Sequence, residues 1–297
     1  METLTTAFSK QIKSVVSIAK ADTVITEDNV YQEGDKNILP FIDGMVDYLC
    51  LPGSGLSGLE NLEELLAKAE SGKSCLLMVE HYSNLDLSLL STLAREAGGR
   101  GKDISDSIIA IAGMKLNEDN PIVAAFASAY TRIVIYPSRS LQHLDPENEK
   151  DKAEIVRSAA INRAAMKALI RHKYKGKLVL LFPSGTRYRP WDPETKKGVR
   201  EIDSYIRSFD YMCFVALNGE VLVVQKSDMM NDYVNKDIVR VTAGPVISCE
   251  EFRENARTAA AENEDKKQAV ADAIMRELEK MHLAVEEERK KLIGGVA

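Results

Sequence analysis

The chain has few of the residues and patterns that mark specialised classes of protein. Its four cysteines show no C-x-x-C spacing, and no histidine lies near them at the spacing of a metal site. We therefore expect free thiols in a reducing compartment and no metal centre. A basic excess is also missing, because 45 acidic residues oppose 39 basic ones for a net charge of −6. Nucleic-acid binders usually show such an excess, so no nucleic-acid partner is expected.

Long apolar runs are missing as well. No stretch reaches the roughly 18 residues that a membrane-spanning helix needs, and Arg132 interrupts the longest candidate, residues 121–136. The N-terminus lacks the charged-then-apolar pattern of a secretion signal. We expect a soluble protein, or one that at most makes peripheral contact with a membrane. What remains is an ordinary globular composition, with 45% apolar and 28% charged residues.

Proline and glycine at residues 52–55 divide the chain into two parts. Residues 1–55 hold two apolar segments, 4–20 with helical spacing and 38–50, and are interpreted as a small helical region that packs on the rest. Over residues 56–297, short apolar runs alternate with helical segments. This alternation predicts an α/β domain with a mostly parallel central sheet flanked by helices.

Apolar periodicity and turn residues give the expected positions of the elements in this domain. Helices are expected at residues 58–71, 87–97, 121–129 and 153–171, with one or two more over 250–292. Strands are expected at residues 75–79, 107–112, 132–136, 177–182, 212–217, 221–226 and 238–243.

A histidine and an aspartate follow the strand expected at residues 75–79. His81 lies just beyond its carboxyl end, where ligands bind in an open α/β sheet. Asp86 suits the first turn of the next helix. A loop that folds back would let Asp86 accept the proton of one ring nitrogen, leaving the other nitrogen to deprotonate a hydroxyl. The alternative is that Asp86 only caps a helix and that His81 has no chemical role.

Two arginines follow the turn that ends the strand expected at residues 177–182. Arg187 and Arg189 lie two apart, and alternate residues of an extended segment point to the same side. Two guanidiniums on one side can hold a phosphate through charge-assisted hydrogen bonds. N–H groups of a tight glycine turn can help to bind the anion. The turn residues of this predicted phosphate site are Ser184, Gly185 and Thr186. The alternative is a pair of surface arginines bonded to neighbouring acids.

Two further strands bring cations to the same edge of the sheet. Arg139 and Ser140 follow the strand at residues 132–136, which makes Arg139 a candidate third phosphate contact. Lys115 follows the strand at residues 107–112 and is a further candidate, with a solvated surface lysine as its alternative.

Together these segments resemble the glycerolipid acyltransferases, and among them the soluble glycerol-3-phosphate acyltransferases of plastids and some bacteria. His81 and Asp86 match the H-x-x-x-x-D motif of the family, and residues 183–187 match its P-[SE]-G-x-R block. Arg189 followed by proline matches the soluble branch. The remaining matches are a strand with basic residues at 132–140 and a hydrophobic block at 214–217. The resemblance covers about residues 56–226, and it departs from the soluble branch at Arg139-Ser140, where that branch tends to have a basic pair.

The resemblance implies direct acyl transfer from a fatty acyl thioester of acyl carrier protein or coenzyme A to the sn-1 hydroxyl of glycerol 3-phosphate. His81 would act as the base, Asp86 would stabilise its imidazolium, and the cationic residues would bind the phosphate. It implies no cofactor, and a cytoplasmic or plastid-stromal location. Two alternatives stay open: a 1-acyl-glycerol-3-phosphate acyltransferase acting on the sn-2 hydroxyl, and a non-catalytic anionic-lipid binder on the same fold.

Three other patterns have less specific explanations. Residues 53–58 match G-x-G-x-x-G, but Pro52 precedes them where a dinucleotide site needs a strand, so a linker is expected. The basic residues of 171–177 either dock an acidic acyl carrier protein or complement a helix C-terminus. Amphipathic helices at 4–20 and 266–291 either touch a membrane or pack on the core.

Overall fold

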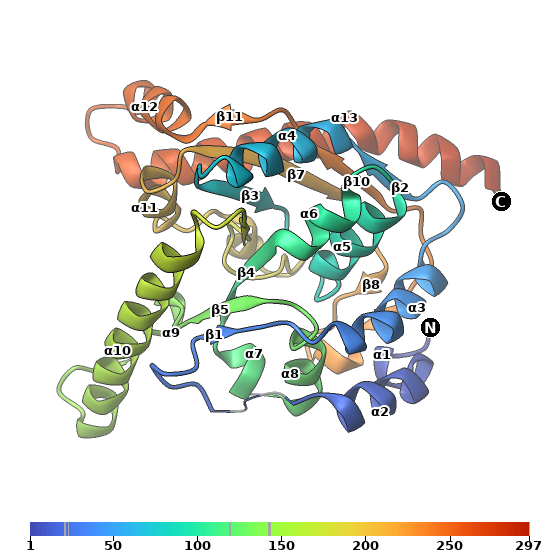
Figure 1. Cartoon of the computed structure of the whole chain (residues 1–297), viewed down its shortest axis with the longest axis horizontal. Coiled ribbons are helices and arrows are strands. Elements are labelled where there is room, and N and C mark those ends of the chain that lie inside the picture. The colour runs from blue at the N-terminus through green and yellow to red at the C-terminus, as the bar shows by residue number, and fades with distance from the viewer. Residues whose placement is uncertain (21, 23, 119, 142–143, 228, 297) are drawn as a thin grey trace.

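A mixed sheet of nine strands forms the centre of the computed structural model, which describes residues 1–20, 22, 24–118, 120–141, 144–227 and 229–296 (Figure 1). The order along the sheet is β1-β5-β4-β6-β3-β7-β10-β2, and β11 pairs with β7. The strands are β1 (Tyr31–Gln32), β2 (Gly55–Ser57), β3 (Cys75–Val79), β4 (Ile108–Gly113), β5 (Arg132–Ile135), β6 (Leu178–Leu181), β7 (Tyr211–Asn218), β10 (Arg240–Ala243) and β11 (Ile247–Ser248).

Five neighbouring strands of this sheet, β5, β4, β6, β3 and β7, run parallel to one another. The outer strands β1 and β10 are antiparallel to their neighbours β5 and β7. The predicted α/β class with a mostly parallel sheet is therefore confirmed. In a parallel group the carboxyl ends of all strands meet at one edge, and that edge carries the predicted site residues.

Helices cover both faces of the sheet. They are α1 (Leu4–Ala7), α2 (Ser9–Ile18), α3 (Leu39–Leu49), α4 (Leu59–Glu70), α5 (Asp86–Glu96), α6 (Gly101–Ser107), α7 (Lys115–Glu118), α8 (Pro121–Ala127), α9 (Ser138–Leu141), α10 (Glu149–His172), α11 (Ile202–Arg207), α12 (Cys249–Ala259) and α13 (Lys266–Val296). None of the helices in the described part of the chain is both long enough and apolar enough to cross a bilayer.

The central strand β3 is buried on both faces, which explains its unbroken apolar sequence. Cys75, Leu77 and Val79 face a core that α3, α4, α5 and α6 close. Leu76 and Met78 face a second core that α10, α11 and α13 close. Because the chain crosses from strand to strand through these helices, both cores are filled from distant parts of the sequence.

Three expectations about individual elements are wrong. Residues 221–226 do not form a strand of the sheet, because only Leu222–Val223 (β8) is extended and it pairs with β9 (Tyr233–Val234) in a separate two-stranded sheet. The long helix starts at Glu149 rather than 153, where the side chain of Asn148 accepts a hydrogen bond from the N–H of Lys150 at 2.9 Å. The expected linker at 53–58 contains β2, which pairs with β10. A three-residue strand is too short to show an apolar alternation.

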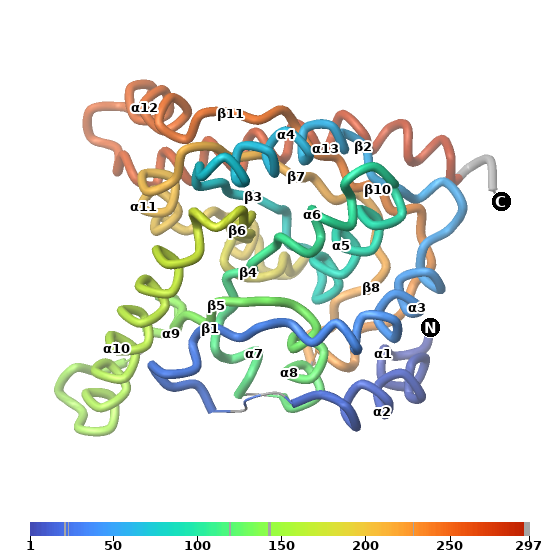
Figure 2. Tube along the Cα trace, viewed as in Figure 1, coloured from blue at the N-terminus to red at the C-terminus, as the bar shows by residue number. Residues whose placement is uncertain are grey.

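The two ends of the chain lie against the sheet and the loops beside it. Figure 2 shows α13 running along the sheet beside β7 and β10, and α1 contacts β9. The N–H of Leu4 donates to the carbonyl of Asp232 at 2.8 Å, and the N–H of Val234 donates to that of Glu2 at 2.9 Å. The first residues of the chain therefore support the loop before β9.

Candidate functional site

The loop after β3 brings His81 and Asp86 into contact. His81 Nδ1 lies 2.8 Å from Asp86 Oδ2. The Asp86 carboxylate is 2% exposed, and it also accepts the N–H of Tyr82 at 2.6 Å, the N–H of Ser83 at 2.9 Å and the hydroxyl of Ser83 at 2.7 Å. Asp86 is the first residue of α5, so it both begins a helix and orients the imidazole. With Nδ1 engaged, Nε2 is the ring nitrogen available to a substrate.

A second segment fixes His81 from the neighbouring strand. The imidazole stacks on Phe182, which directly follows β6, with ring centroids 4.0 Å apart and an interplanar angle of 16°. The N–H of Tyr188 donates to the backbone carbonyl of His81 at 2.8 Å. Arg187 and Arg189 flank Tyr188, so both arginines lie on a segment that is hydrogen-bonded to the backbone of His81.

The two arginines of the predicted phosphate site have different surroundings. Arg187 is buried and forms an ion pair with Asp232, whose side chain is fully buried. The other oxygen of Asp232 accepts the N–H of Gln225 at 2.8 Å. Arg189 is partly exposed, and within the described ranges no ion-pair partner faces its guanidinium. Arg187 therefore has a structural partner, whereas Arg189 has no ion pair with any residue that the structure describes.

The turn between β6 and these arginines is closed by its own polar groups. Ser184 is buried and its hydroxyl donates to the carbonyl of Thr186 at 2.6 Å. The N–H of Gly185 donates to the carbonyl of Phe182 at 2.9 Å, and Gly185 has a φ of 65°, a left-handed conformation that favours glycine. The Ser184 hydroxyl thus forms a hydrogen bond within the turn. Thr186, two residues further on, is half-buried.

The other predicted cations follow strands further along the sheet. Lys115 begins α7 after β4 and is exposed. Arg139 and Ser140 lie in α9 after β5, and Arg139 Nη2 donates to the carbonyl of Lys197 at 3.5 Å. At a strand spacing of about 4.8 Å, the end of β4 lies roughly 10 Å from that of β3, and the end of β5 roughly 14 Å. Among the predicted phosphate contacts, Arg139 therefore follows the strand that lies farthest from β3 in the sheet.

Arg139 also lines a groove with a volume of about 870 Å³. Its opposite wall comes from α13, with Asp272, Met275 and Glu279, and Val199 lies on its lining. The N–H of Val199 donates to the carbonyl of Pro183 at 2.9 Å, so the groove borders the turn after β6. His81 is not among the residues that line the groove.

The sequence analysis missed the contacts that Glu80, Tyr82 and His282 make beside His81. Glu80 is buried, and it accepts the hydroxyl of Tyr82 at 2.9 Å and the N–H of Leu217 at 2.8 Å. His282 Nδ1 lies 3.0 Å from the same carboxylate. Burial and the nearby Glu80 carboxylate raise the pKa of Tyr82 well above its usual range. Glu80 and Tyr82, the residues on either side of His81, are thus joined by a hydrogen bond between their side chains.

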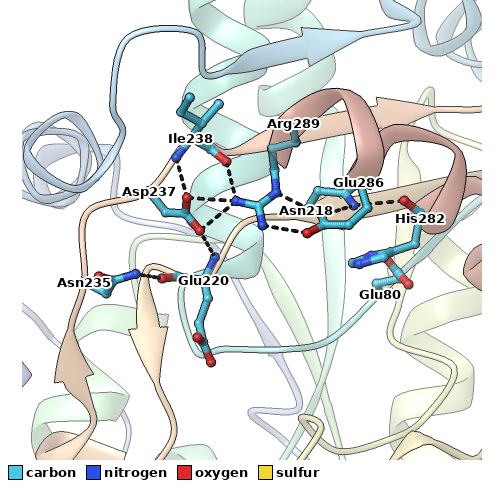
Figure 3. A network of polar contacts seen from close by, with 9 residues as sticks. All are labelled: Glu80, Asn218, Glu220, Asn235, Asp237, Ile238, His282, Glu286 and Arg289. Carbon is cyan, nitrogen blue, oxygen red and sulfur yellow. Dashed lines mark hydrogen bonds and ion pairs between the residues drawn. The ribbon is translucent and has the colours of Figure 1, made fainter. Parts of the chain in front are cut away.

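His282 belongs to a polar network that anchors α13 beside the strand ends (Figure 3). Asn218 Nδ2 donates to the carbonyl of His282 and to Glu286, each at 3.0 Å. Arg289 donates to Glu286 at 2.7 Å and to Asp237 at 2.8 Å. The hydrogen bond from Arg289 lowers the pKa of Glu286 to about 2. The C-terminal helix is therefore held against the end of β7, the strand next to β3, which carries His81.

The sequence offered one signal for these missed residues. Glu80 is a charged residue between a buried strand and the candidate base, which is an unusual position for a carboxylate that has no partner. Its partner His282 lies 202 residues away, and Asp232 lies 45 residues from Arg187. No local pattern predicts contacts of such separation.

The cysteines and possible metal ligands of the described residues form no second reactive centre. Burial raises the pKa of both Cys75 and Cys213 to about 12. Burial also raises the pKa of Cys50, to about 11. These thiols are therefore protonated near neutral pH and are poor nucleophiles. Across the described ranges, no group of three or more histidine, cysteine, aspartate or glutamate side chains is arranged to hold a metal ion.

The fold and site define an α/β protein with a histidine–aspartate pair at the carboxyl edge of a parallel sheet. No protein-family model matches the chain, and no curated protein matches it. A functional interpretation therefore depends on the side chains themselves and on the motifs they form.

Proposed function

We propose that the protein is a glycerol-3-phosphate 1-O-acyltransferase, which transfers a fatty acyl group from an acyl thioester to the sn-1 hydroxyl. The main support is the pairing of His81 with Asp86 at 2.8 Å, on a loop that is bonded to the arginine segment through Tyr188. A base beside a cationic segment suits a small phosphorylated alcohol, because the phosphate can be held while the hydroxyl meets the base.

In the proposed reaction, Nε2 of His81 takes the proton of the sn-1 hydroxyl as its oxygen attacks the thioester carbonyl. Asp86 stabilises the imidazolium that forms. The new C–O bond replaces the C–S bond, and the thiolate leaves and recovers the proton from the imidazolium. Thiols have a pKa of about 8.5, so the thiolate is a good leaving group. The high thiol pKa values of the buried cysteines support direct transfer without an acyl-cysteine.

The phosphate of the acceptor is proposed to meet Arg189 first, because that guanidinium has no ion-pair partner among the described residues. Arg187 would add a guanidinium that Asp232 keeps in a fixed orientation. Lys115 and Arg139 would approach from the ends of β4 and β5. Charge-assisted hydrogen bonds of this kind are short and directional, so they would position the hydroxyl as well as bind the substrate.

The acyl donor is proposed to be the thioester of acyl carrier protein or coenzyme A, and the reaction needs no cofactor. The proposed location is the cytoplasm, or the plastid stroma in a plant or alga.

A thiol-release assay tests the proposal. Acyl carrier protein and coenzyme A thioesters are each combined with glycerol 3-phosphate and with its 1-acyl derivative. Thiol release with glycerol 3-phosphate, and an sn-1 ester as product, is the expected result. Release only with the 1-acyl acceptor would instead identify an sn-2 acyltransferase. Lipid binding without thiol release from any combination would identify a non-catalytic lipid binder.

A further inference from the structure

The outer face of α10 carries two parallel rows of side chains. Arg163, Lys167 and Arg171 are spaced four residues apart, and Lys175 follows at the same interval in the turn after the helix. All four are exposed. A second row, also at intervals of four, consists of Met166, Ile170 and Tyr174, which are 47%, 55% and 51% exposed. Residues four apart lie above one another on a helix, so each row forms a continuous ridge.

This face lies opposite the face that α10 buries. The buried residues are Ser158, Ile161, Ala165, Ala168 and Leu169. At about 100° per residue, they centre on the side of the helix away from both ridges. Figure 1 shows α10 at the outer edge of the molecule, and no described element lies beyond it there. The two ridges therefore face outward.

The charge of this region contrasts with the acidic chain as a whole. Between Glu154 and Asp192 the sequence has no acidic residue. Its cations there are Arg157, Arg163, Lys167, Arg171, Lys173, Lys175, Lys177, Arg187 and Arg189.

Some of these cations have partners in the structure. Lys173 donates to the carbonyl of Ser208, and Arg157 pairs with Glu118. Within the described residues, no carboxylate pairs with any of the four cations of the ridge. Burial is the largest cause that lowers the pKa of His172, and the nearby cations Lys175 and Arg171 lower it further.

Helix stability does not account for this arrangement. Like charges four residues apart destabilise a helix by a few tenths of a kcal/mol per pair. Cations are favoured at a helix C-terminus, but that effect fades beyond the last turn. Arg163 lies more than two turns before the end of α10 at His172. The ridge therefore indicates an external partner that supplies negative charge.

We propose that the outer face of α10 docks on an anionic lipid bilayer. The cationic ridge would meet the phosphates of the headgroups, and Met166 and Ile170 would enter the boundary with the acyl chains. Tyr174 suits the headgroup level, where its ring and hydroxyl are both accommodated. A bilayer offers an anionic layer beside an apolar one along the whole length of the two ridges. A nucleic acid offers no apolar surface to cover Met166, Ile170 and Tyr174. An acidic protein would need such a surface in addition to its negative charge.

Flotation with lipid vesicles tests this docking, and it needs no acyl-transfer activity. The full chain is expected to bind vesicles of phosphatidylcholine with phosphatidylglycerol and not vesicles of phosphatidylcholine alone. Each basic residue contributes about a fivefold change in partitioning, so the charge reversal Lys167→Glu/Arg171→Glu is expected to reduce binding by about 30-fold or more. The pair Met166→Ser/Ile170→Ser is expected to weaken binding while the cations remain.

The matched control is Lys280→Glu/Lys290→Glu on α13, which changes the net charge by the same amount at exposed positions. It is expected to leave binding within about twofold. Thermal melts establish that each variant folds, and Lys167→Gln/Arg171→Gln replaces the reversal if that variant does not. Absence of binding to anionic vesicles, or equal loss in the control, overturns the proposal. Loss of binding by charge reversal without any effect of the two serines would show an electrostatic contact with no insertion of the apolar ridge, and it also overturns the docking proposed here.

Discussion

The two sides of the candidate site are built differently. On the histidine side, the main contacts lie within residues 80–86, where Asp86 accepts hydrogen bonds from its own loop and from His81. The cationic side depends on Asp232, 45 residues from the Arg187 that it neutralises. An imidazole needs only one oriented acceptor, whereas a buried guanidinium needs a counter-charge because an unpaired buried charge is very costly. A loop can therefore make a base, but only the fold can make a buried cation.

Each side is also supported by a different end of the chain. The N–H of Leu4 donates to the carbonyl of Asp232 at 2.8 Å, so the N-terminus supports the cationic side. His282 of α13 contacts Glu80, so the C-terminal helix supports the histidine side. Segments from both ends of the chain thus contact residues of the site, although its own motifs lie in the middle of the sequence.

The largest expected effect concerns the base. His81→Ala is expected to lower turnover by about 10²–10⁴-fold, the usual contribution of a general base. The protein should stay folded, because Asp86 keeps its hydrogen bonds from Tyr82 and Ser83, and a thermal melt checks this. His172→Ala is the matched control, since His172 stacks on Tyr31 away from the site and its loss should leave turnover intact. Full activity of His81→Ala in the thiol-release assay would remove the chemistry from this loop.

The comparison between the arginines gives the next effect. Arg187→Ala leaves Asp232 buried without its guanidinium, so the free energy of unfolding should fall by about 3–5 kcal/mol. Arg189→Ala should change stability by less than about 0.5 kcal/mol. It should instead raise KM for glycerol 3-phosphate by an amount equivalent to about 1.5–3 kcal/mol. Urea unfolding and steady-state kinetics measure the two quantities.

A double variant separates the ion pair from substrate binding. Arg187→Met with Asp232→Leu removes both charges, and it should recover most of the stability that Arg187→Ala loses. If Arg187→Ala and Arg189→Ala have the same effect on stability, the two arginines do not differ as the structure indicates.

A smaller effect is expected at the contact between α13 and the base loop. His282→Ala removes one hydrogen bond to the buried Glu80 carboxylate, which contributes about 1.5 kcal/mol. If that free energy holds the loop in its active position, its loss should lower kcat by roughly tenfold. KM should stay unchanged, because His282 positions the loop and does not bind the substrate. His282→Asn can place an amide N–H near the position of Nδ1 and should restore most of kcat. If both variants were as inactive as His81→Ala, His282 would have to act on the substrate directly.

The smallest effect concerns acid stability on the C-terminal side. The pKa of Glu286 is lowered from 4.5 to about 2 in the folded protein, chiefly by its hydrogen bond with Arg289. The folded state therefore binds fewer protons than the unfolded state, and the contribution of Glu286 to stability is complete above pH 4.5 and is lost as the pH falls toward 2. Glu286→Gln should flatten this part of the stability curve in urea titrations, while Glu287→Gln, at the adjacent exposed position, should not.

Much of the fold followed from the sequence because the parallel strands are apolar and β3, β4, β5 and β6 are short and alternate with helices. The strand around residues 75–79 and the helix that begins at Asp86 were predicted nearly to the residue. The short outer strands were not, since β1 and β2 gain their hydrogen bonds from distant partners and have no periodicity of their own. A strand of the central sheet was wrongly predicted at residues 221–226. Their apolar side chains pack on the core as those of a strand would, but their backbone pairs with β9 instead of the central sheet.

The sequence by itself determined the contact between His81 and Asp86, because a strand, a turn and a helix start place the two residues within a few positions of each other. It also determined that arginines follow the turn after β6. Only the tertiary structure decided that Arg187 is buried against Asp232 while Arg189 stays partly exposed, and that His282 contacts Glu80 beside His81. The physical reason is that burial and charge pairing are set by which distant elements pack together, and a local pattern carries no information about them.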